Sequence, residues 1–174
     1  MVNRPGVSRV IMNKGFSLLE TIVALTVLVI ALTGSLTLAS QSIRSASIAK
    51  NQAVASYLAE EAMEYIRNRR DTNIISGLAW DNGLGPCKRR NGCYVDVPSD
   101  KIKRCRFSCP LIKYDSTTGL YRYDVGDETI FKRIVKIKRV PGTDDEIKIK
   151  VIVSWREIFG DFSFNTQEHL FKWQ

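Results

Sequence analysis

The 174-residue sequence contains a single histidine, His169, and lacks the common motifs of nucleotide-binding proteins and metalloproteases. Catalysis by a Ser-His-Asp or Cys-His arrangement needs a histidine beside a nucleophile, and one histidine near the C-terminus gives it little support. The patterns GxGxxG, GxxxxGK(S/T) and HExxH are absent, which leaves dinucleotide-binding, P-loop and zincin functions without support. We therefore expect no enzymatic activity, no cofactor and no metal, and interpret His169 as a strand residue without a chemical role.

Acidic residues are missing from the first 15 positions, and charges of either sign are missing from residues 21–43. The first segment contains Arg4, Arg9 and Lys14, which supply three charges of the formal net charge of +8. The second is long enough to cross a membrane, because about 20 apolar residues in a helix span a ~30 Å hydrocarbon core. Since basic flanks stay in the cytoplasm, the sequence predicts a single-pass membrane protein with a cytoplasmic N-terminus and an exported C-terminal part.

The apolar run alone leaves three kinds of processing open. A conventional signal peptide is cut after the run, and Thr37-Leu38-Ala39 offers a weak site for that. A plain signal anchor is not cut. A third kind of signal is cut before the run, and here the preceding residues are specific: Lys14-Gly15-Phe16-Ser17-Leu18-Leu19-Glu20.

This stretch resembles the class III signal of type IV pilins and type II secretion pseudopilins. The resemblance implies cleavage after Gly15 by prepilin peptidase, N-methylation of Phe16, and a role in assembly for Glu20, the fifth residue of the mature chain. Glycine lets a membrane protease approach the backbone closely. A pair between Glu20 and the amino group of Phe16 on a neighbouring subunit would set the register of adjacent helices. Met12 is an alternative start, so the first 11 residues are not necessarily translated.

Proline is absent between Pro5 and Pro86, which permits one continuous helix over residues 16–70. We expect a leader peptide over residues 1–15, a transmembrane and filament-core helix over 16–43, and an amphipathic continuation over 44–71. The expected apolar stripe of the continuation follows a 3.6-residue period through Ala46, Ala49 or Ala53, Val54, Tyr57, Leu58, Ala62 or Met63, and Ile66. Residues 53–67 also resemble minor pilins and pseudopilins, most of all minor pilin V and secretion pseudopilin I.

Residues 72–174 are expected to form a globular β domain. A hairpin is predicted over residues 111–124, with its turn at 115–119, and further strands over 130–140, 147–155 and 162–170. In the strand over 130–140, Val135 and Ile137 face one way and Lys136 and Lys138 the other. In the strand over 147–155, the odd-numbered residues form an apolar face and Lys148 and Lys150 lie on the other face. The resulting antiparallel sheet of three to four strands has one apolar face, and the amphipathic half of the helix is the candidate cover. The predicted fold class is α+β, with a long N-terminal helix packed on a small antiparallel sheet, and it agrees with the pilin fold.

Four cysteines lie within a loop over residues 87–109, at Cys87, Cys93, Cys105 and Cys109. An even number of cysteines in an oxidising compartment indicates two disulfides, for which three pairings exist. We prefer bonds between neighbours in the sequence, Cys87 with Cys93 and Cys105 with Cys109. Free thiols are one alternative, and a zinc site is another, although the spacing C-x5-C-x11-C-x3-C departs from that of zinc knuckles.

Basic residues crowd the same loop, at Lys88, Arg89, Arg90, Lys101, Lys103, Arg104 and Arg106. Such a loop can contact DNA or another anionic surface. We favour the simpler interpretation of a solvated loop with counterions, because no row of aromatic residues of the kind that binds single strands accompanies it.

Together these features predict a minor type IV pilin or pseudopilin, a structural subunit of a pilus or pseudopilus or of its priming tip. Its expected partners are prepilin peptidase, other pilins or pseudopilins bound through the N-terminal helix, and the inner-membrane assembly platform. DNA is a weaker candidate. One alternative is a single-pass envelope protein whose basic exported domain binds a ligand or DNA. Another is a secreted soluble domain cut near Ala39.

Overall fold

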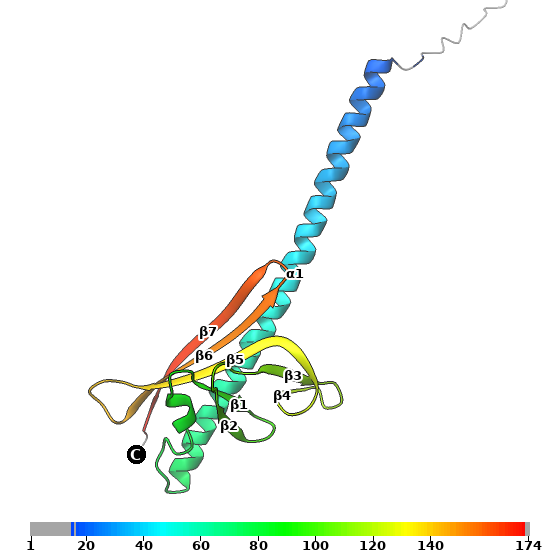
Figure 1. The fold of residues 1–174 in the computed structure, drawn as a ribbon. Coiled ribbons are helices and arrows are strands. Elements are labelled where there is room, and N and C mark those ends of the chain that lie inside the picture. Colours follow the sequence, from blue (N-terminus) through cyan, green and yellow to red (C-terminus); the bar gives the residue numbers. More distant parts are fainter. Residues whose placement is uncertain (1–14, 16, 173–174) are drawn as a thin grey trace, which may run out of the picture. The chain divides into compact units, whose positions relative to one another are not determined.

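The computed structural model describes residue 15 and residues 17–172, which form one long helix followed by an antiparallel sheet (Figure 1). The chain divides into two compact units, Met1–Ser47 and Ile48–Gln174, called here the N-terminal and C-terminal units. The helix α1 covers Leu18–Ile75 and so contributes to both. The other elements are η1 (Gly85–Lys88), β1 (Cys93–Asp96), β2 (Lys101–Arg104), β3 (Leu111–Asp115), β4 (Leu120–Arg122), β5 (Asp127–Arg139), β6 (Glu146–Glu157) and β7 (Gly160–Phe171).

The predicted α+β architecture is confirmed, since a long N-terminal apolar helix packs through its C-terminal part on an antiparallel sheet. The helix continues to Ile75, beyond the predicted end at residue 70. Except for Gly15, the predicted leader peptide lies outside the described residues. The domain boundaries at residues 43 and 71 stay predictions.

In the N-terminal unit, α1 exposes apolar side chains on every side. Within the described residues it is the one helix long and apolar enough to cross a membrane. Its hydroxyl groups donate hydrogen bonds to carbonyls four residues earlier, as seen for Thr26, Thr33, Ser35, Thr37 and Ser40. The helix therefore offers few unpaired polar groups to lipid or to apolar neighbours.

In the C-terminal unit, α1 buries a stripe of mostly apolar residues, three of them alanines, against the sheet. The buried residues are Ala55, Leu58, Ala59, Ala62, Met63, Ile66, Arg70 and Asn73. The expected stripe was wrong in its first half, because Tyr57 is 71% exposed and Ala46, Ala49 and Ala53 are exposed as well. Neighbouring residues on a helix point about 100° apart, so a stripe centred on Leu58 and Ile66 leaves Tyr57 outside it. The alanines let the sheet approach the helix closely.

The helix ends in a glycine-dependent cap. Gly77 has a φ of 68°, the left-handed conformation that glycine adopts most readily. Its N–H donates to Ile74 O at 3.0 Å, and the N–H of Leu78 donates to Asn73 O at 2.8 Å, which is the Schellman pattern. The buried Asn73 amide in turn donates to the carbonyls of Trp80 and Asn82. These contacts fasten the turn after the helix to its last turn.

Strand β5 organises the sheet. One of its edges pairs with β6 from Lys132 to Arg139, and its other edge pairs with β3 near its start and with β1 at Val135. Strand β7 pairs with β6 along its whole length, β2 pairs with β1, and β4 pairs with β3. The predicted hairpin and the three later strands are present as β3–β4, β5, β6 and β7.

The sheet has seven strands within the described residues, instead of the three to four expected. The unexpected strands, β1 and β2, have four residues each and lie inside the cysteine-rich segment predicted as a loop. Four residues are too few for an alternating pattern to be recognised. The segment is therefore a disulfide-bonded hairpin attached to the edge of β5.

The core lies between α1 and the inner face of the sheet. Alternate residues of β5 and β6 are buried there, as expected for a sheet with one covered face. The members from these two strands are Phe131, Val135, Ile137, Ile147, Ile149, Val151, Val153 and Trp155. Their even-numbered neighbours lie on the other face and include Lys136, Lys138, Lys148 and Lys150, so the predicted alternation is confirmed in both strands.

One charged side chain, Arg133, lies inside this core and is 1% exposed. Its Nη1 donates to Leu58 O at 2.7 Å and to Glu61 Oε2 at 2.6 Å, and its Nη2 donates to Val95 O at 2.6 Å. A buried charge is tolerated only when it is paired and hydrogen-bonded. Arg133 therefore joins the helix, the central strand β5 and the hairpin strand β1.

Candidate functional site

The first candidate site is the predicted cleavage and assembly region at the start of α1. Gly15 is exposed and precedes the helix, whereas Phe16, the predicted site of N-methylation, lies outside the described residues. The helix begins at Leu18, and the N–H of Thr21 donates to Ser17 O at 3.1 Å. Cleavage after Gly15, methylation of Phe16 and the assembly role of Glu20 stay predictions.

Glu20 lies in the first turn of α1 and is exposed. A carboxylate at this end of a helix is favoured by the helix dipole. Its neighbours Leu18, Leu19, Ile22 and Val23 are exposed apolar side chains. Within the described residues Glu20 forms no ion pair, so in the single chain it is an acidic group on an otherwise apolar surface.

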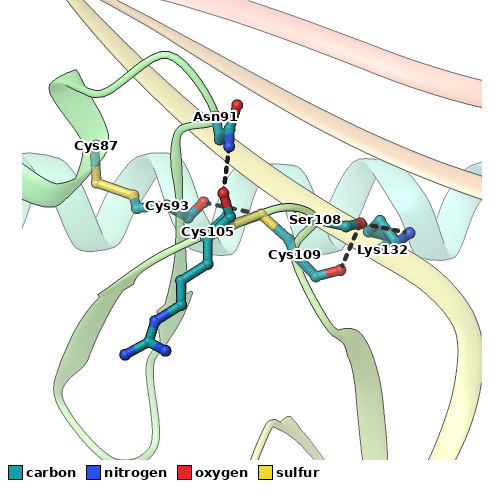
Figure 2. The surroundings of a disulfide bond; sticks show 8 residues. Cys87, Asn91, Cys93, Cys105, Ser108, Cys109 and Lys132 are labelled. Carbon is teal, nitrogen blue, oxygen red and sulfur yellow. Dashed lines mark hydrogen bonds between the residues drawn. A yellow bond between two sulfur atoms is a disulfide. The ribbon is translucent and has the colours of Figure 1, made fainter.

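The second candidate site is the cysteine-rich segment, in which two disulfides are formed (Figure 2). Cys87 is bonded to Cys93 with a Cα–Cα distance of 4.5 Å, and Cys105 to Cys109 with 4.8 Å. These are the neighbours in sequence that we preferred. All four cysteines are buried, and among the described residues no group of three or more His, Cys, Asp or Glu side chains is arranged to hold a metal ion.

Gly92 fixes the segment to the sheet. Its φ is 72°, and a Cβ at this position would lie 2.5 Å from Val135 O in β5, so a larger residue would displace the hairpin. The carbonyl of Gly92 accepts a hydrogen bond from Cys105 N at 3.1 Å. The Asn91 side-chain amide donates to Arg106 O at 2.5 Å (Figure 2). The second disulfide loop is thereby held against the start of β1.

A cleft of about 920 Å³ opens beside this second disulfide loop. It is lined by Arg89, Arg90, Asn91, Arg104, Cys105, Arg106 and Phe107, and is called here the arginine cleft. Phe107, at the tip of the loop closed by Cys105 and Cys109, is 98% exposed. The disulfide orders a tight turn that presents an aromatic ring next to guanidinium groups.

The arginines of this cleft differ from the other arginines of the C-terminal unit. Seven of those form ion pairs with carboxylates, at Arg67, Arg69, Arg70, Arg122, Arg133, Arg139 and Arg156. None of the four arginines in the cleft forms an ion pair within the described part of the chain. The positive field of the arginine cleft is therefore not neutralised by the fold.

Lys88 and Arg139, in contrast to the arginines of the cleft, are paired with a carboxylate, that of Asp81. It accepts a hydrogen bond from Lys88 and lies 3.3 Å from Arg139 Nη2. The hydrogen bond from Lys88, followed by that from Arg139, holds the pKa of Asp81 below its usual value. The stabilisation by this pair is complete above the usual pKa of the carboxyl and is lost as the pH falls through the lowered pKa. Lys88 thus serves the fold, whereas Arg89 and Arg90 next to it face the cleft.

Reduction of the disulfides is expected to loosen this segment. Each closes a short loop, with six residues of separation for Cys87–Cys93 and four for Cys105–Cys109. The chain-entropy model gives about 2 kcal/mol for loops of this size. We expect Cys105→Ala/Cys109→Ala to lower the free energy of unfolding of the C-terminal unit by about that amount, measured by urea titration of the full chain in detergent micelles. The prediction is contradicted if dithiothreitol leaves the urea midpoint of the wild-type chain unchanged.

The comparison with known proteins concerns the first candidate site. Residues 12–36 match the model of the prokaryotic N-terminal methylation motif. This motif is the class III signal of type IV pilins and pseudopilins, so the resemblance based on residues 14–20 is confirmed. The motif and the apolar helix that contains its C-terminal part fit single-pass anchoring in the inner membrane with an exported domain. No curated protein and no solved structure matches the chain.

Proposed function

We propose that this chain is a minor type IV pilin or pseudopilin, cut after Gly15 by prepilin peptidase and assembled into a pilus or pseudopilus. The observation that carries the proposal is the methylation motif over residues 12–36, whose larger part forms the start of a helix with apolar residues on all sides. The motif indicates a structural subunit, and we infer that the chain performs no reaction itself. It is a substrate of the peptidase and a building block for the filament.

The N-terminal unit supports assembly through the helix. In the single chain no described residue covers its apolar surface, which a lipid bilayer and a bundle of like helices can both cover. Transfer from membrane to filament would then exchange lipid contacts for helix contacts. Glu20 would distinguish the two environments, because in the filament a neighbouring subunit can offer it an amino group of complementary charge.

Three features favour a minor subunit over an abundant one. The C-terminal unit carries a cysteine-rich hairpin with an unneutralised basic cleft. Residues 53–67 resemble minor pilin V and pseudopilin I. The length of 174 residues also suits a specialised subunit, and a place at the priming tip would leave the hairpin exposed.

The mature N-terminus tests the proposal. The full chain should be expressed with and without a prepilin peptidase, and its first residue identified by mass spectrometry. We expect a chain that begins at N-methylated Phe16 only when the peptidase is present. Gly15→Asp should block cleavage, since a charged side chain replaces the glycine at the cut, whereas Gly34→Ala, with no described side chain within 4 Å, should not.

Two outcomes would contradict the proposal. An intact chain in the presence of an active peptidase would favour the single-pass envelope protein. A chain that begins near Ser40 would favour a conventionally secreted domain.

A further inference from the structure

The outer face of the sheet, opposite the face that α1 covers, carries lysines in directly facing pairs. The register of β5 and β6 sets Lys136 against Lys150 and Lys138 against Lys148. The residues between them in each strand are buried in the core, so the lysines project on the solvent side. All four line a hollow of about 370 Å³ together with Ile152 and Gln167.

This arrangement costs the fold stability, because like charges directly opposite one another across strands repel. None of the four lysines forms an ion pair with a carboxylate of residues 15 or 17–172. On the neighbouring strand β7, Gln167 faces Lys150 and cannot supply a negative charge. His169 faces Lys148, and its ring nitrogen Nδ1 contacts Glu146 Oε1 at 2.5 Å, so Glu146 is engaged by His169.

The lysine rows adjoin the arginine cleft. A Cβ at Gly92 would lie 3.0 Å from the Cγ of Lys136, which places the start of the cysteine-rich hairpin directly beside the outer face. Lys132, also in β5, donates through Nζ to the Ser108 hydroxyl at 3.0 Å, and Ser108 belongs to the loop closed by Cys105 and Cys109 (Figure 2). The two groups of cations therefore form one surface. We call it the basic surface; it consists of Arg89, Arg90, Arg104, Arg106, Lys136, Lys138, Lys148 and Lys150.

We propose that the basic surface binds the phosphodiester backbone of duplex DNA without reading its sequence. Residues two apart in a strand lie about 6.7 Å apart, so the lysine pairs follow one another along the strands and, with the arginines, form a row of cations that suits a row of phosphates. Guanidinium groups add bidentate contacts to phosphate oxygens. Duplex DNA has the charge density that such a surface needs, because each neutralised phosphate releases condensed counterions.

The scarcity of aromatic residues on the basic surface favours duplex DNA over single-stranded nucleic acid as its ligand. Binding of single strands relies on successive aromatic rings on which bases stack. The arginine cleft contains one aromatic residue, Phe107, and the lysine hollow contains none within the described residues. The proposal is independent of processing at Gly15, since it concerns the C-terminal unit alone.

Salt-dependent binding of the full chain in nonionic detergent tests the proposal. The probe is a fluorescent duplex of about 30 base pairs and mixed sequence, followed by anisotropy between about 50 and 200 mM salt. Each phosphate contact contributes about 0.9 to the slope of log affinity against log salt. We expect Lys136→Gln/Lys150→Gln and Arg104→Gln/Arg106→Gln each to reduce the slope by about 2 and to weaken binding roughly 10- to 60-fold near 0.1 M salt.

The control is Lys50→Gln/Lys172→Gln, which removes the same net charge from exposed positions outside the basic surface, although Lys172, unlike the lysines of that surface, lies 3.7 Å from a carboxylate oxygen of Asp145. It should bind like the wild type. Lys136→Gln/Lys150→Gln should also melt no lower than the wild type, because it removes a repulsive pair, and this separates lost contacts from lost folding. The proposal is overturned if the slope is the same in all variants, if the control loses as much affinity, or if the chain binds anionic lipid vesicles but not the duplex.

Discussion

Replacement of Arg133 by alanine is expected to lower the free energy of unfolding of the C-terminal unit by about 3–5 kcal/mol. The guanidinium group is almost completely buried and bonds to three groups on two other elements, namely Leu58 O and Glu61 of α1 and Val95 O of β1. Alanine removes all of these bonds, leaves Glu61 without its partner, and opens a cavity in the core.

The measurement is urea unfolding of the full chain in detergent micelles, followed by tryptophan fluorescence, to which the buried Trp155 contributes; its ring lies 5.9 Å from that of Phe131. Lys132→Ala is the matched control, since Lys132 neighbours Arg133 but projects on the outer face, and it should change stability by no more than about 0.5 kcal/mol. Glu61→Gln should cost less than Arg133→Ala, because Glu61 is 34% exposed in its side chain and its amide can still accept a hydrogen bond. Equal urea midpoints for Arg133→Ala and Lys132→Ala would refute the anchoring role.

The burial of Arg133 could not be predicted from the sequence. The predicted strand over residues 130–140 placed Val135 and Ile137 on one face, and Arg133 shares their parity. An arginine in such a series indicates a solvent-facing position or a strand boundary unless its partners are known. Those partners, Leu58 and Val95, lie 75 and 38 residues away. Its odd number, which it shares with Val135 and Ile137, could have marked Arg133 as a charged residue on the apolar face. The carbonyls that bind it are brought there by tertiary packing, which has no local signal.

The long elements could be predicted because each repeats its pattern several times. The apolar run of α1 covers more than 20 residues, and the alternation in β6 runs from Ile147 to Trp155, whereas the alternation in β5 is interrupted at Arg133 and Ile134. The stripe of α1 was misplaced at Tyr57 because tyrosine is apolar enough to fit a periodic pattern, whereas the sheet selects the small residues Ala55 and Ala59.

Only part of the basic surface could be predicted from the sequence. The crowded cations of the loop over residues 87–109 were evident, and the outward direction of Lys136 and Lys138 was predicted. That these lysines face Lys150 and Lys148 depends on the register of β5 and β6, which the turn between them sets. The contact between the hairpin and β5 at Gly92 depends on tertiary packing and has no local signal.

Replacement of Glu20 by alanine is expected to leave cleavage after Gly15 intact and to reduce incorporation into filaments a hundredfold or more. Removal of one member of a buried ion pair costs about 3–5 kcal/mol, since the partner charge stays buried, and each 1.4 kcal/mol is about tenfold in an equilibrium. Under the proposed function the partner is the amino group of the mature N-terminus on a neighbouring subunit. In the membrane-anchored single chain this cost does not arise, because Glu20 is exposed and lies in the first turn of α1.

Incorporation is measured as the ratio of chain in sheared filaments to chain in membranes, with the N-terminus of both pools identified by mass spectrometry. Glu20→Gln removes the charge of Glu20 and keeps the shape of its side chain. If the charge pair matters, incorporation of Glu20→Gln should be as low as that of Glu20→Ala. If a hydrogen bond is enough, incorporation of Glu20→Gln should be largely kept. Thr26→Ala is the control in the same helix, because the Thr26 hydroxyl is already satisfied by Ile22 O and its loss should leave incorporation unchanged. Wild-type incorporation of correctly processed Glu20→Ala would rule out the pair. A defect already present in cleavage would place the role of Glu20 in processing, and the register between subunits would then rest on helix packing alone.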